Sequence, residues 1–251
     1  MVTRPDPTWE RPLAVLFDLD GTLYDQRPLR RAMLKELACA PLTKGPRGAW
    51  KVARCLRAFR IRREDLRDLG DGSEPLRLLQ YERPAAELGV PPGVVEKIVE
   101  EWMYRKPLRH LGHAGWPRLR ATLQALKDAG LKLGVFSDYP PAEKLQALGI
   151  ADLFDVAIGA TDENVNAFKP HAKGFLAGAR ALGAAPGDVV YVGDRHDLDG
   201  AGAEAAGMRH VILETGVSHV GESGEASERT ASPRCRTIQD FSEVPHGVGI
   251  S

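Results

Sequence analysis

Short apolar runs alternate with amphipathic segments over much of the chain. The first run, Leu13 to Phe17, is apolar at every position and stops abruptly at Asp18. A continuous apolar run of this length predicts a strand buried on both faces of a sheet. Further short runs predict strands at 131–136, 156–158, 189–192, 210–213 and 236–238. Helices are predicted between them at 117–129, 142–148, 171–182 and 198–206, and a Gly/Ser-rich loop at 216–232. This alternation indicates an α/β fold with a parallel sheet covered by helices on both faces.

A long segment between the first two strands has no strand pattern. Helices are predicted there at 29–40, 50–59, 75–88 and 92–104, separated by Pro and Gly clusters at 41–46 and 70–72. From Gln26 to His110 there are 19 Lys and Arg against 11 Asp and Glu, whereas the whole chain has a formal net charge of zero. We therefore predict an all-helical domain at 26–111, inserted into a core formed by 1–25 and 112–251.

The composition indicates in which compartment of the cell this chain is expected to work. Its 251 residues contain no apolar run near the roughly 20 residues that a membrane span requires, and residues 1–12 lack the apolar core of a signal peptide. Three widely spaced cysteines, Cys39, Cys55 and Cys235, fit neither a disulfide framework nor a metal knuckle. A cytoplasmic location is the simplest expectation.

Polar clusters follow the predicted strands where each of them ends. Asp18 and Asp20 follow the first strand, Ser137-Asp138 the second, and Gly193-Asp194 a later one. Asp199 lies five residues beyond Asp194, and Lys169 precedes a helix. Because ligands bind at the carboxyl ends of parallel strands, these clusters are expected to meet at one edge of the sheet.

Four carboxylates at one edge would repel one another unless a cation lies among them. Magnesium prefers oxygen ligands and is commonly held by one or two carboxylates and a substrate phosphate. In such a site Asp18 can attack phosphorus and form an acyl phosphate, and Asp20 can protonate the leaving oxygen and then activate water. Lys169 can neutralise the developing charge, and Gly21 allows the backbone to approach a phosphate. The predicted phosphate-binding positions are Gly21, Thr22, Ser137, Asp138 and Lys169.

These residues strongly resemble the motifs of the haloacid dehalogenase-like (HAD) superfamily. The four motifs match Asp18-Leu19-Asp20-Gly21-Thr22, then Ser137, then Lys169, then Gly193-Asp194 with Asp199. The resemblance implies a Rossmann-like core with an inserted helical cap. It also implies a phosphorylated Asp18 and a magnesium ion held by the Asp18 side chain, the Asp20 backbone carbonyl and Asp194, with Asp199 in support.

Two departures narrow the reaction class. The dehalogenases of this superfamily lack the second aspartate of the first motif, whereas Asp20 is present here. Related mutases have a histidine twelve residues after the nucleophile, where this chain has Arg30. We therefore expect a magnesium-dependent phosphatase acting on a small phosphate monoester. A phosphomutase or phosphotransferase of the same superfamily, and a non-catalytic binding protein that uses its basic cap, are the alternatives.

The basic cap is expected to influence substrate choice. Between Lys44 and Arg67 there are nine basic and two acidic residues. Most of these are expected to be solvated, with Trp50 packing their helix onto its neighbours and both Cys39 and Cys55 inside the cap. Two groups of arginines and lysines are candidates for binding a second anionic group of the substrate: Arg47, Lys51 and Arg54, or Arg27, Arg30 and Arg31. Arg195 and His196 are expected to cap the next helix or to reach the site. No membrane or nucleic-acid partner is expected, and the sequence does not define the specific ester or the oligomeric state.

Overall fold

The computed structural model describes residues 9–69, 74–215 and 232–250, and its sheet is parallel, as the apolar runs predict. Six parallel strands lie in the order β3-β2-β1-β4-β5-β6. They are β1 (Ala14–Phe17), β2 (Lys132–Ser137), β3 (Val156–Gly159), β4 (Val189–Gly193), β5 (Arg209–Leu213) and β6 (Cys235–Ile238). Strand β1 therefore lies between β2 and β4, which places three of the polar strand ends side by side.

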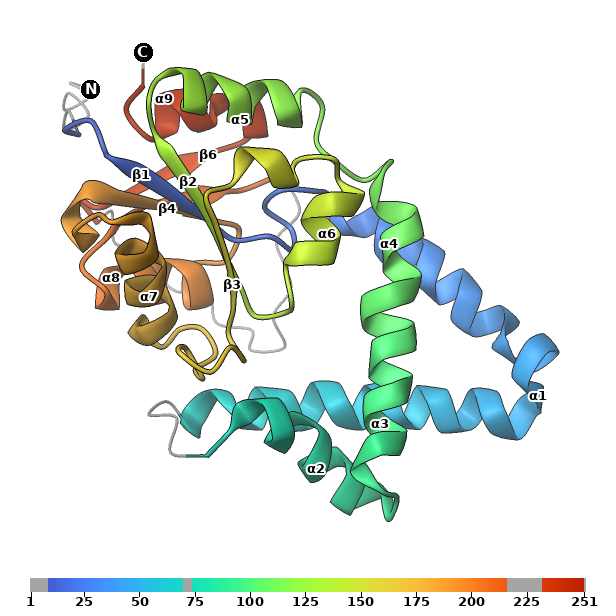
Figure 1. Ribbon diagram of the computed structural model, residues 1–251. Coiled ribbons are helices and arrows are strands. Elements are labelled where there is room, and N and C mark those ends of the chain that lie inside the picture. The colour runs from blue at the N-terminus through green and yellow to red at the C-terminus, as the bar shows by residue number, and fades with distance from the viewer. Residues whose placement is uncertain (1–8, 70–73, 216–231, 251) are drawn as a thin grey trace, which may run out of the picture.

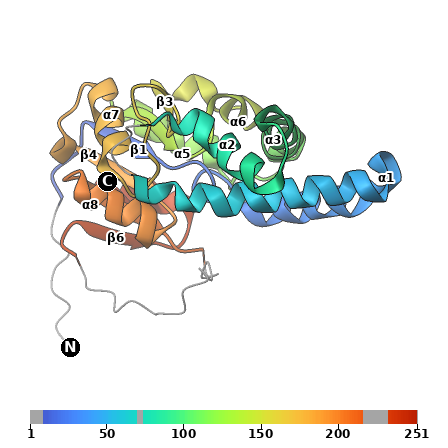
Figure 2. The same ribbon diagram turned by 90° about the horizontal axis from the view of Figure 1, so that it is seen from below.

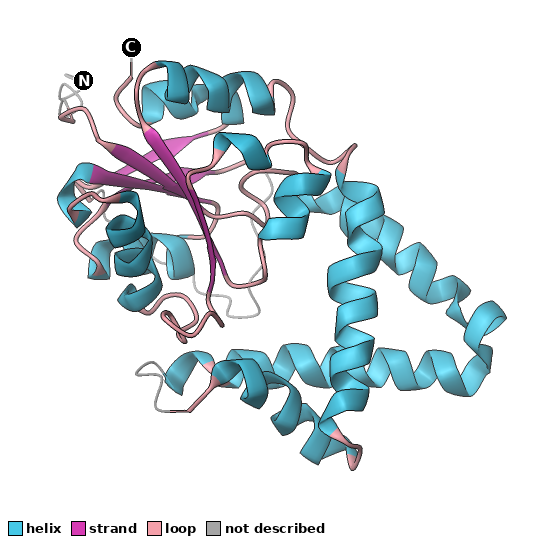
Figure 3. Cartoon of the chain, viewed as in Figure 1, coloured by secondary structure: helices cyan, strands magenta, loops and turns pink. Residues whose placement is uncertain are grey.

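Helices cover both faces of this sheet, as Figure 1 and Figure 3 show. The described core helices are α5 (Leu119–Asp128), α6 (Ala142–Ala147), α7 (Ala172–Leu182), α8 (Ala201–Ala205) and α9 (Val244–Gly247). Alternate β1 residues serve opposite layers: Val15 and Phe17 pack in one hydrophobic cluster with residues of α5 and α9, whereas Ala14 and Leu16 pack in another with residues of α7. Burial on both faces explains why β1 has no polar position.

The helical insertion consists of α1 (Gln26–Asp65), α2 (Leu76–Leu88), α3 (Pro92–Val99) and α4 (Lys106–Leu111), with π-helical residues Glu100–Arg105 joining the last two. The insertion begins at Gln26 and ends at Leu111, and the division of the chain into two domains at these residues stays a prediction. Figure 2 shows α1 extending away from the sheet. None of the described helices combines the length and apolarity of a membrane span.

Helix α1 differs from the predicted pair of separate helices. It continues through the proline cluster and changes direction at Gly45, whose φ of 69° and ψ of 165° are not helical. Glycine adopts this conformation without a steric cost, and Pro46 then stands at a position where a helix can restart. The cluster therefore produces a kink instead of a loop. The other predicted breaks, at 70–72 and over most of 216–232, lie outside the described residues.

Two predictions about the packing of α1 were wrong. Trp50 is 67% exposed, and Cys39 is exposed, whereas Cys55 is buried as expected. The buried face of this part of α1 is formed by small and aliphatic residues such as Val52 and Leu56. A bulky Trp50 is one position out of phase with that face, so it points to solvent.

An ionic cluster joins the two ends of the insertion. The Glu36 carboxylate on α1 accepts hydrogen bonds from Lys106 Nζ (3.0 Å), Arg109 Nε (3.0 Å) and, when its ring nitrogen carries a proton, His110 Nε2 (2.7 Å) on α4. The bond from Arg109 lowers the pKa of Glu36 to about 2, burial opposes this shift, and the bonds from His110 and Lys106 add to it. The cluster thus holds the first and last helices of the cap together.

Candidate active site

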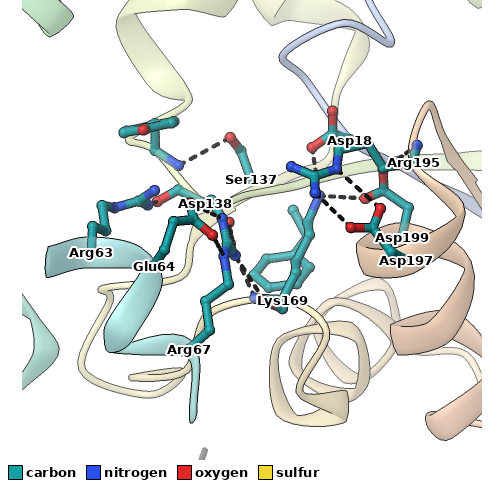
Figure 4. A network of polar contacts seen from close by, with 12 residues as sticks. Asp18, Arg63, Glu64, Arg67, Ser137, Asp138, Lys169, Arg195, Asp197 and Asp199 are labelled. Carbon is teal, nitrogen blue, oxygen red and sulfur yellow. Dashed lines mark hydrogen bonds and ion pairs between the residues drawn. The ribbon is translucent and has the colours of Figure 1, made fainter. Parts of the chain in front are cut away.

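Residues from separate segments of the chain meet at the carboxyl edge of the sheet (Figure 4). Asp18 follows β1, and Lys169 comes from the segment between β3 and α7. The Lys169 Nζ lies 2.5 Å from Asp18 Oδ1 and 2.8 Å from Asp199 Oδ1. All three residues are at least 93% buried, since the exposed fractions are 7%, 3% and 2% for Asp18, Lys169 and Asp199. The predicted convergence of the first, third and fourth motifs is therefore present.

Asp199 organises the loop that follows β4. Its Oδ1 accepts hydrogen bonds from Lys169 Nζ and from the Tyr191 hydroxyl at 3.1 Å. Its Oδ2 accepts from the backbone N–H groups of Asp194 (3.2 Å) and Arg195 (3.0 Å). Four donors on one buried carboxylate fix the backbone that carries Asp194. Asp199 is thus suited to support a metal site more than to bind the ion directly.

The donor set fits a hard divalent cation. Carboxylate oxygens of Asp18, Asp194 and Asp199 lie within 4.8 Å of one another. Lys169 lies at the edge of this group, 2.5 Å from Asp18 Oδ1 and 2.8 Å from Asp199 Oδ1. A cluster of carboxylate oxygens is the kind of ligand set that Mg²⁺ prefers. Asp18 and Asp194 would hold the ion, and Asp199 would orient them.

Burial and charge act in opposite directions on the two central groups. Burial raises the pKa of Asp18 well above its ordinary value, Lys169 opposes this, and the nearby carboxylates of Asp199, Asp194 and Asp20 add to it. For Lys169, burial alone would lower the pKa, but the carboxylates outweigh burial and the pKa is raised. Lys169 therefore remains a cation beside Asp18. A divalent ion beside Asp18 would favour the ionised carboxylate that a nucleophile needs.

Gly21 is placed so that Asp194 can lie against the backbone of the first motif. Its φ is +107°, and a Cβ built on it would lie 2.3 Å from Asp194 Oδ2. No side chain could occupy that space without displacing the carboxylate. Gly21 therefore allows close packing of the first and fourth motifs, in addition to its predicted approach to phosphate.

Asp20 has partners that the sequence analysis did not anticipate. Both of its carboxylate oxygens are bound by Lys144 Nζ, at 2.5 Å and 2.6 Å, and its Oδ1 also accepts a hydrogen bond from the Tyr24 hydroxyl. Lys144 lies in α6, and Tyr24 precedes α1. Burial raises the pKa of Tyr24 well above its ordinary value, and Asp20 adds to the shift, so the tyrosine stays a donor.

The predicted phosphate-binding residues occupy different positions. Ser137 is 1% exposed at the end of β2, and its Oγ accepts a hydrogen bond from the Tyr139 N–H at 3.2 Å. Thr22 is completely buried, and its hydroxyl has no hydrogen-bond partner among the described residues. The Asp138 carboxylate accepts a hydrogen bond from the Lys169 N–H at 3.1 Å and is paired with Arg67 of the insertion at 2.5 Å. The side chain of Asp138 thus joins core and cap.

The end of α1 and the short helix after it, Arg67–Leu69, supply the cap residues that reach the core. Arg67 Nη1 also donates to the Lys169 carbonyl at 2.8 Å. Arg63 is 2% exposed, donates to the Asp138 carbonyl, and has its Cζ 3.9 Å from the centre of the Tyr139 ring and 4.2 Å from that of Phe168. These two arginines, which sequence reasoning did not single out, join the insertion to the loops around the site. The signal for them in the sequence is the density of basic residues between Lys44 and Arg67.

The basic residues that were singled out lie elsewhere. Arg47, Lys51 and Arg54 are exposed on the distal part of α1. Arg27 is paired with Asp25 at 2.7 Å, and Arg30 donates to Gln26 at 2.5 Å. Arg195 is paired with Asp197 at 2.6 Å, and His196 Nε2 lies 3.0 Å from Glu214. A role for any of them in substrate binding remains a prediction.

Comparisons with known proteins point to one family. A family model for haloacid dehalogenase-like hydrolases matches residues 12–207. The chain is 31% identical over 209 residues to the glyceraldehyde 3-phosphate phosphatase of Methanopyrus kandleri, covering 81% of this chain and 84% of that protein. It is 31% identical over 234 residues to the phosphoglycolate phosphatase of Escherichia coli, covering 85% of each.

A solved structure gives the same result. The HAD phosphatase from Thermococcus onnurineus is 27% identical, superposes with a TM-score of 0.62, and is covered over 97% of its length by 94% of this chain. The chain therefore belongs to the haloacid dehalogenase-like hydrolases and is an enzyme of the phosphatase branch of that family.

Proposed function

We propose that this enzyme is a magnesium-dependent phosphatase that hydrolyses a small organic phosphate monoester through a phosphorylated Asp18. The observation that supports this most directly is the buried contact of Asp18 with Lys169, beside Asp194 and Asp199. A nucleophilic carboxylate, a fixed cation and two further carboxylates are the components that phosphoryl transfer through an acyl phosphate requires.

In the first half-reaction, an Asp18 carboxylate oxygen forms a bond to phosphorus while the bond from phosphorus to the ester oxygen breaks. Asp20, in its protonated form, gives its proton to the departing oxygen, so that an alcohol leaves. Lys169 stays within hydrogen-bond distance of Asp18 and stabilises the negative charge around it. When bound by Asp18 and Asp194, Mg²⁺ would offset negative charge on the phosphoryl oxygens.

In the second half-reaction, Asp20 is a carboxylate and accepts a proton from water. The resulting hydroxide attacks phosphorus, and the bond between phosphorus and Asp18 breaks. Inorganic phosphate is released, and Asp20 again carries the proton needed for the next cycle. The Ser137 hydroxyl and the backbone N–H groups near Gly21 and Asp138 are the proposed phosphoryl-oxygen contacts, because they follow β1 and β2 at the same edge of the sheet as Asp18.

The relatives and the cap support a proposal for the substrate class. We propose a short-chain phosphate monoester, because the two curated relatives are named for phosphoglycolate and glyceraldehyde 3-phosphate. We further propose that the substrate carries a second anionic group, bound by an arginine near the beginning of α1. Arg30 is the preferred candidate, since it is exposed and close enough to influence Tyr24, which contacts Asp20.

A panel of phosphate monoesters, assayed with and without Mg²⁺, tests these proposals. We expect phosphate release only with the metal, loss of nearly all turnover in Asp18→Asn, and a higher kcat/KM for phosphoglycolate than for neutral esters of the same length. Substantial turnover by a folded Asp18→Asn enzyme would exclude the nucleophile. Equal turnover of neutral and anionic esters would exclude the second anionic group alone. Conversion of a substrate to its isomer, in place of phosphate release, would identify a mutase.

A further inference from the structure

The Asp20 carboxylate is bound by a buried lysine that the proposed mechanism does not use. Lys144 is only 7% exposed, and its Nζ bridges both carboxylate oxygens of Asp20 at 2.5 Å and 2.6 Å. Lysine is rarely buried to this extent unless it is paired. The partner here is the residue proposed to move the proton in both half-reactions. The pair therefore bears directly on the chemistry.

Lys144 approaches Asp20 from a different segment of the chain than Lys169, which contacts Asp18. It lies in the middle of α6, which follows the loop after β2 and packs against α4 of the insertion. Its Nζ also lies 5.3 Å from the centre of the Tyr139 ring. Lys169, in contrast, comes from the segment between β3 and α7 and contacts Asp18 and Asp199. Asp18 and Asp20 are thus paired with different lysines.

This arrangement separates the side chain of Asp20 from the proposed metal centre. The carboxylate oxygens that lie close enough to share an ion belong to Asp18, Asp194 and Asp199, and among the described residues that group does not include Asp20. A free carboxylate two residues from Asp18 would be attracted to any divalent cation bound there. Lys144 provides a competing attraction, and the Tyr24 hydroxyl adds a second fixed donor on the same carboxylate.

We propose that Lys144 is the positioning residue of Asp20, fixing its carboxylate at the side of the site where the leaving oxygen and the attacking water must pass. This inference rests on the proposed phosphatase mechanism. General acid–base catalysis requires the group to lie within hydrogen-bond distance of the proton that moves. Without Lys144, Asp20 would still be present but would sample other orientations, including one turned toward the metal.

The leaving group makes this role measurable. An alkyl phosphate needs a proton on its departing oxygen, whereas p-nitrophenyl phosphate releases a stable phenolate and needs little help. Since kcat/KM reports the steps up to phosphorylation of Asp18, loss of a positioned acid should lower it mainly for the alkyl substrate. Asp20→Asn removes the acid completely and serves as the reference. Its kcat/KM for the alkyl ester should fall by about 100-fold or more.

The experiment compares Lys144→Met and Lys144→Arg with the wild type on both substrates. We expect Lys144→Met to lower kcat/KM for the alkyl phosphate by about 10- to 100-fold and for the aryl phosphate by less than about 3-fold. Lys144→Arg should recover part of the alkyl activity, because a guanidinium can also bind a carboxylate through two hydrogen bonds. Lys127→Met is the matched control: Lys127 pairs with Asp155 at 2.9 Å on the surface, near the other end of the strands, and its loss should change neither value.

An equal fall for both substrates, or no fall for either, would overturn the proposal. Lys144→Gln gives an independent readout should Lys144→Met not fold, since its side-chain amide removes the charge but can still donate a hydrogen bond to Asp20. That variant should show a weaker fall confined to the alkyl substrate, and a uniform effect or none would again refute the positioning role. Failure of the whole phosphatase mechanism would be recognised separately, because Asp18→Asn would then keep its turnover.

Discussion

Replacement of Gly21 by alanine should disable the site through a single methyl group. A Cβ at this position would lie 2.3 Å from Asp194 Oδ2 and 2.9 Å from its Cγ. Ordinary contacts begin near 3.4 Å, so the carboxylate must retreat by about 1 Å. A displacement of that size at a catalytic group typically costs about 100-fold in rate. We therefore expect Gly21→Ala to lower kcat/KM by about 100-fold and to raise the Mg²⁺ concentration needed for half-maximal activity.

The backbone of Gly21 adds a second cost that a control can separate. A φ of +107° is strained for any residue with a Cβ, at about 1–3 kcal/mol of folding free energy. Gly89, at the end of α2, also has a positive φ, +65°, but a Cβ there would meet nothing within 4 Å. Gly89→Ala should therefore lose about 1 kcal/mol of stability, which is about 2–4 °C in the midpoint of thermal unfolding, without any change in kinetics.

Steady-state kinetics at several Mg²⁺ concentrations, together with thermal unfolding of both variants, tests this reasoning. The expected pattern is loss of stability in both proteins and loss of activity in Gly21→Ala alone. A Gly21→Ala enzyme with wild-type kcat/KM and wild-type Mg²⁺ dependence would show that the Asp194 carboxylate does not need its observed position. Either that position is then irrelevant to the reaction, or the metal is bound elsewhere.

Three other changes test features outside Gly21. Tyr191→Phe removes one hydrogen-bond donor from the buried Asp199 carboxylate but keeps the ring, so it should destabilise the fold by about 1–2 kcal/mol in urea unfolding. An unchanged unfolding midpoint would contradict the role of Asp199 in organising the loop after β4. Glu36→Gln should cost only about 1 kcal/mol at pH 7, since the cluster lies near the surface. The pKa of Glu36 is lowered to about 2, so the stabilisation from its ion pairs should be present above about pH 4.5 and should disappear as the pH falls toward 2. Unfolding curves of variant and wild type at several pH values would reveal this loss. A stability difference between the two proteins that is unchanged at pH 2 would refute it. Arg67→Met breaks a half-buried ion pair with Asp138, so we expect faster proteolytic cleavage between cap and core. An unchanged cleavage rate would mean that this pair does not hold cap and core together.

Much of the core could be predicted from the sequence because its strands are buried on both faces. That environment leaves unbroken apolar runs such as Leu13 to Phe17, and the ends of such runs identify Asp18 and Asp194 directly. The kink in α1 could not be predicted in the same way. Proline and glycine indicate a break, but they do not distinguish a loop from a bend at Gly45, because tertiary packing decides between them.

The supporting residues of the site were missed for a different reason. Tyr191 lies within an apolar strand and has the pattern of an ordinary core residue, although its hydroxyl binds Asp199. Lys144 lies in a short polar helix and has the pattern of a solvated lysine. Arg67 was hidden among many basic residues of α1 and the turn that follows it. The roles of Lys144 and Arg67 depend on partners more than 50 residues away in the chain, and that of Tyr191 depends on one polar atom in an apolar setting. Hydrophobic periodicity indicates neither.

The two lysines of the site explain how carboxylates so close in sequence can do different work. In the proposed mechanism Asp18 is the ionised nucleophile, and Lys169 binds both Asp18 and Asp199, so that the two carboxylates are held in the buried cluster where a divalent ion fits. In the same mechanism Asp20 exchanges a proton with the leaving oxygen and with water, and it is paired with Lys144, which we propose holds it apart from that cluster. Because the lysines come from different segments, after β3 and in α6, one can be changed without moving the other. Removal of Lys169 should therefore abolish turnover of every ester, whereas removal of Lys144 should discriminate among esters by their leaving groups.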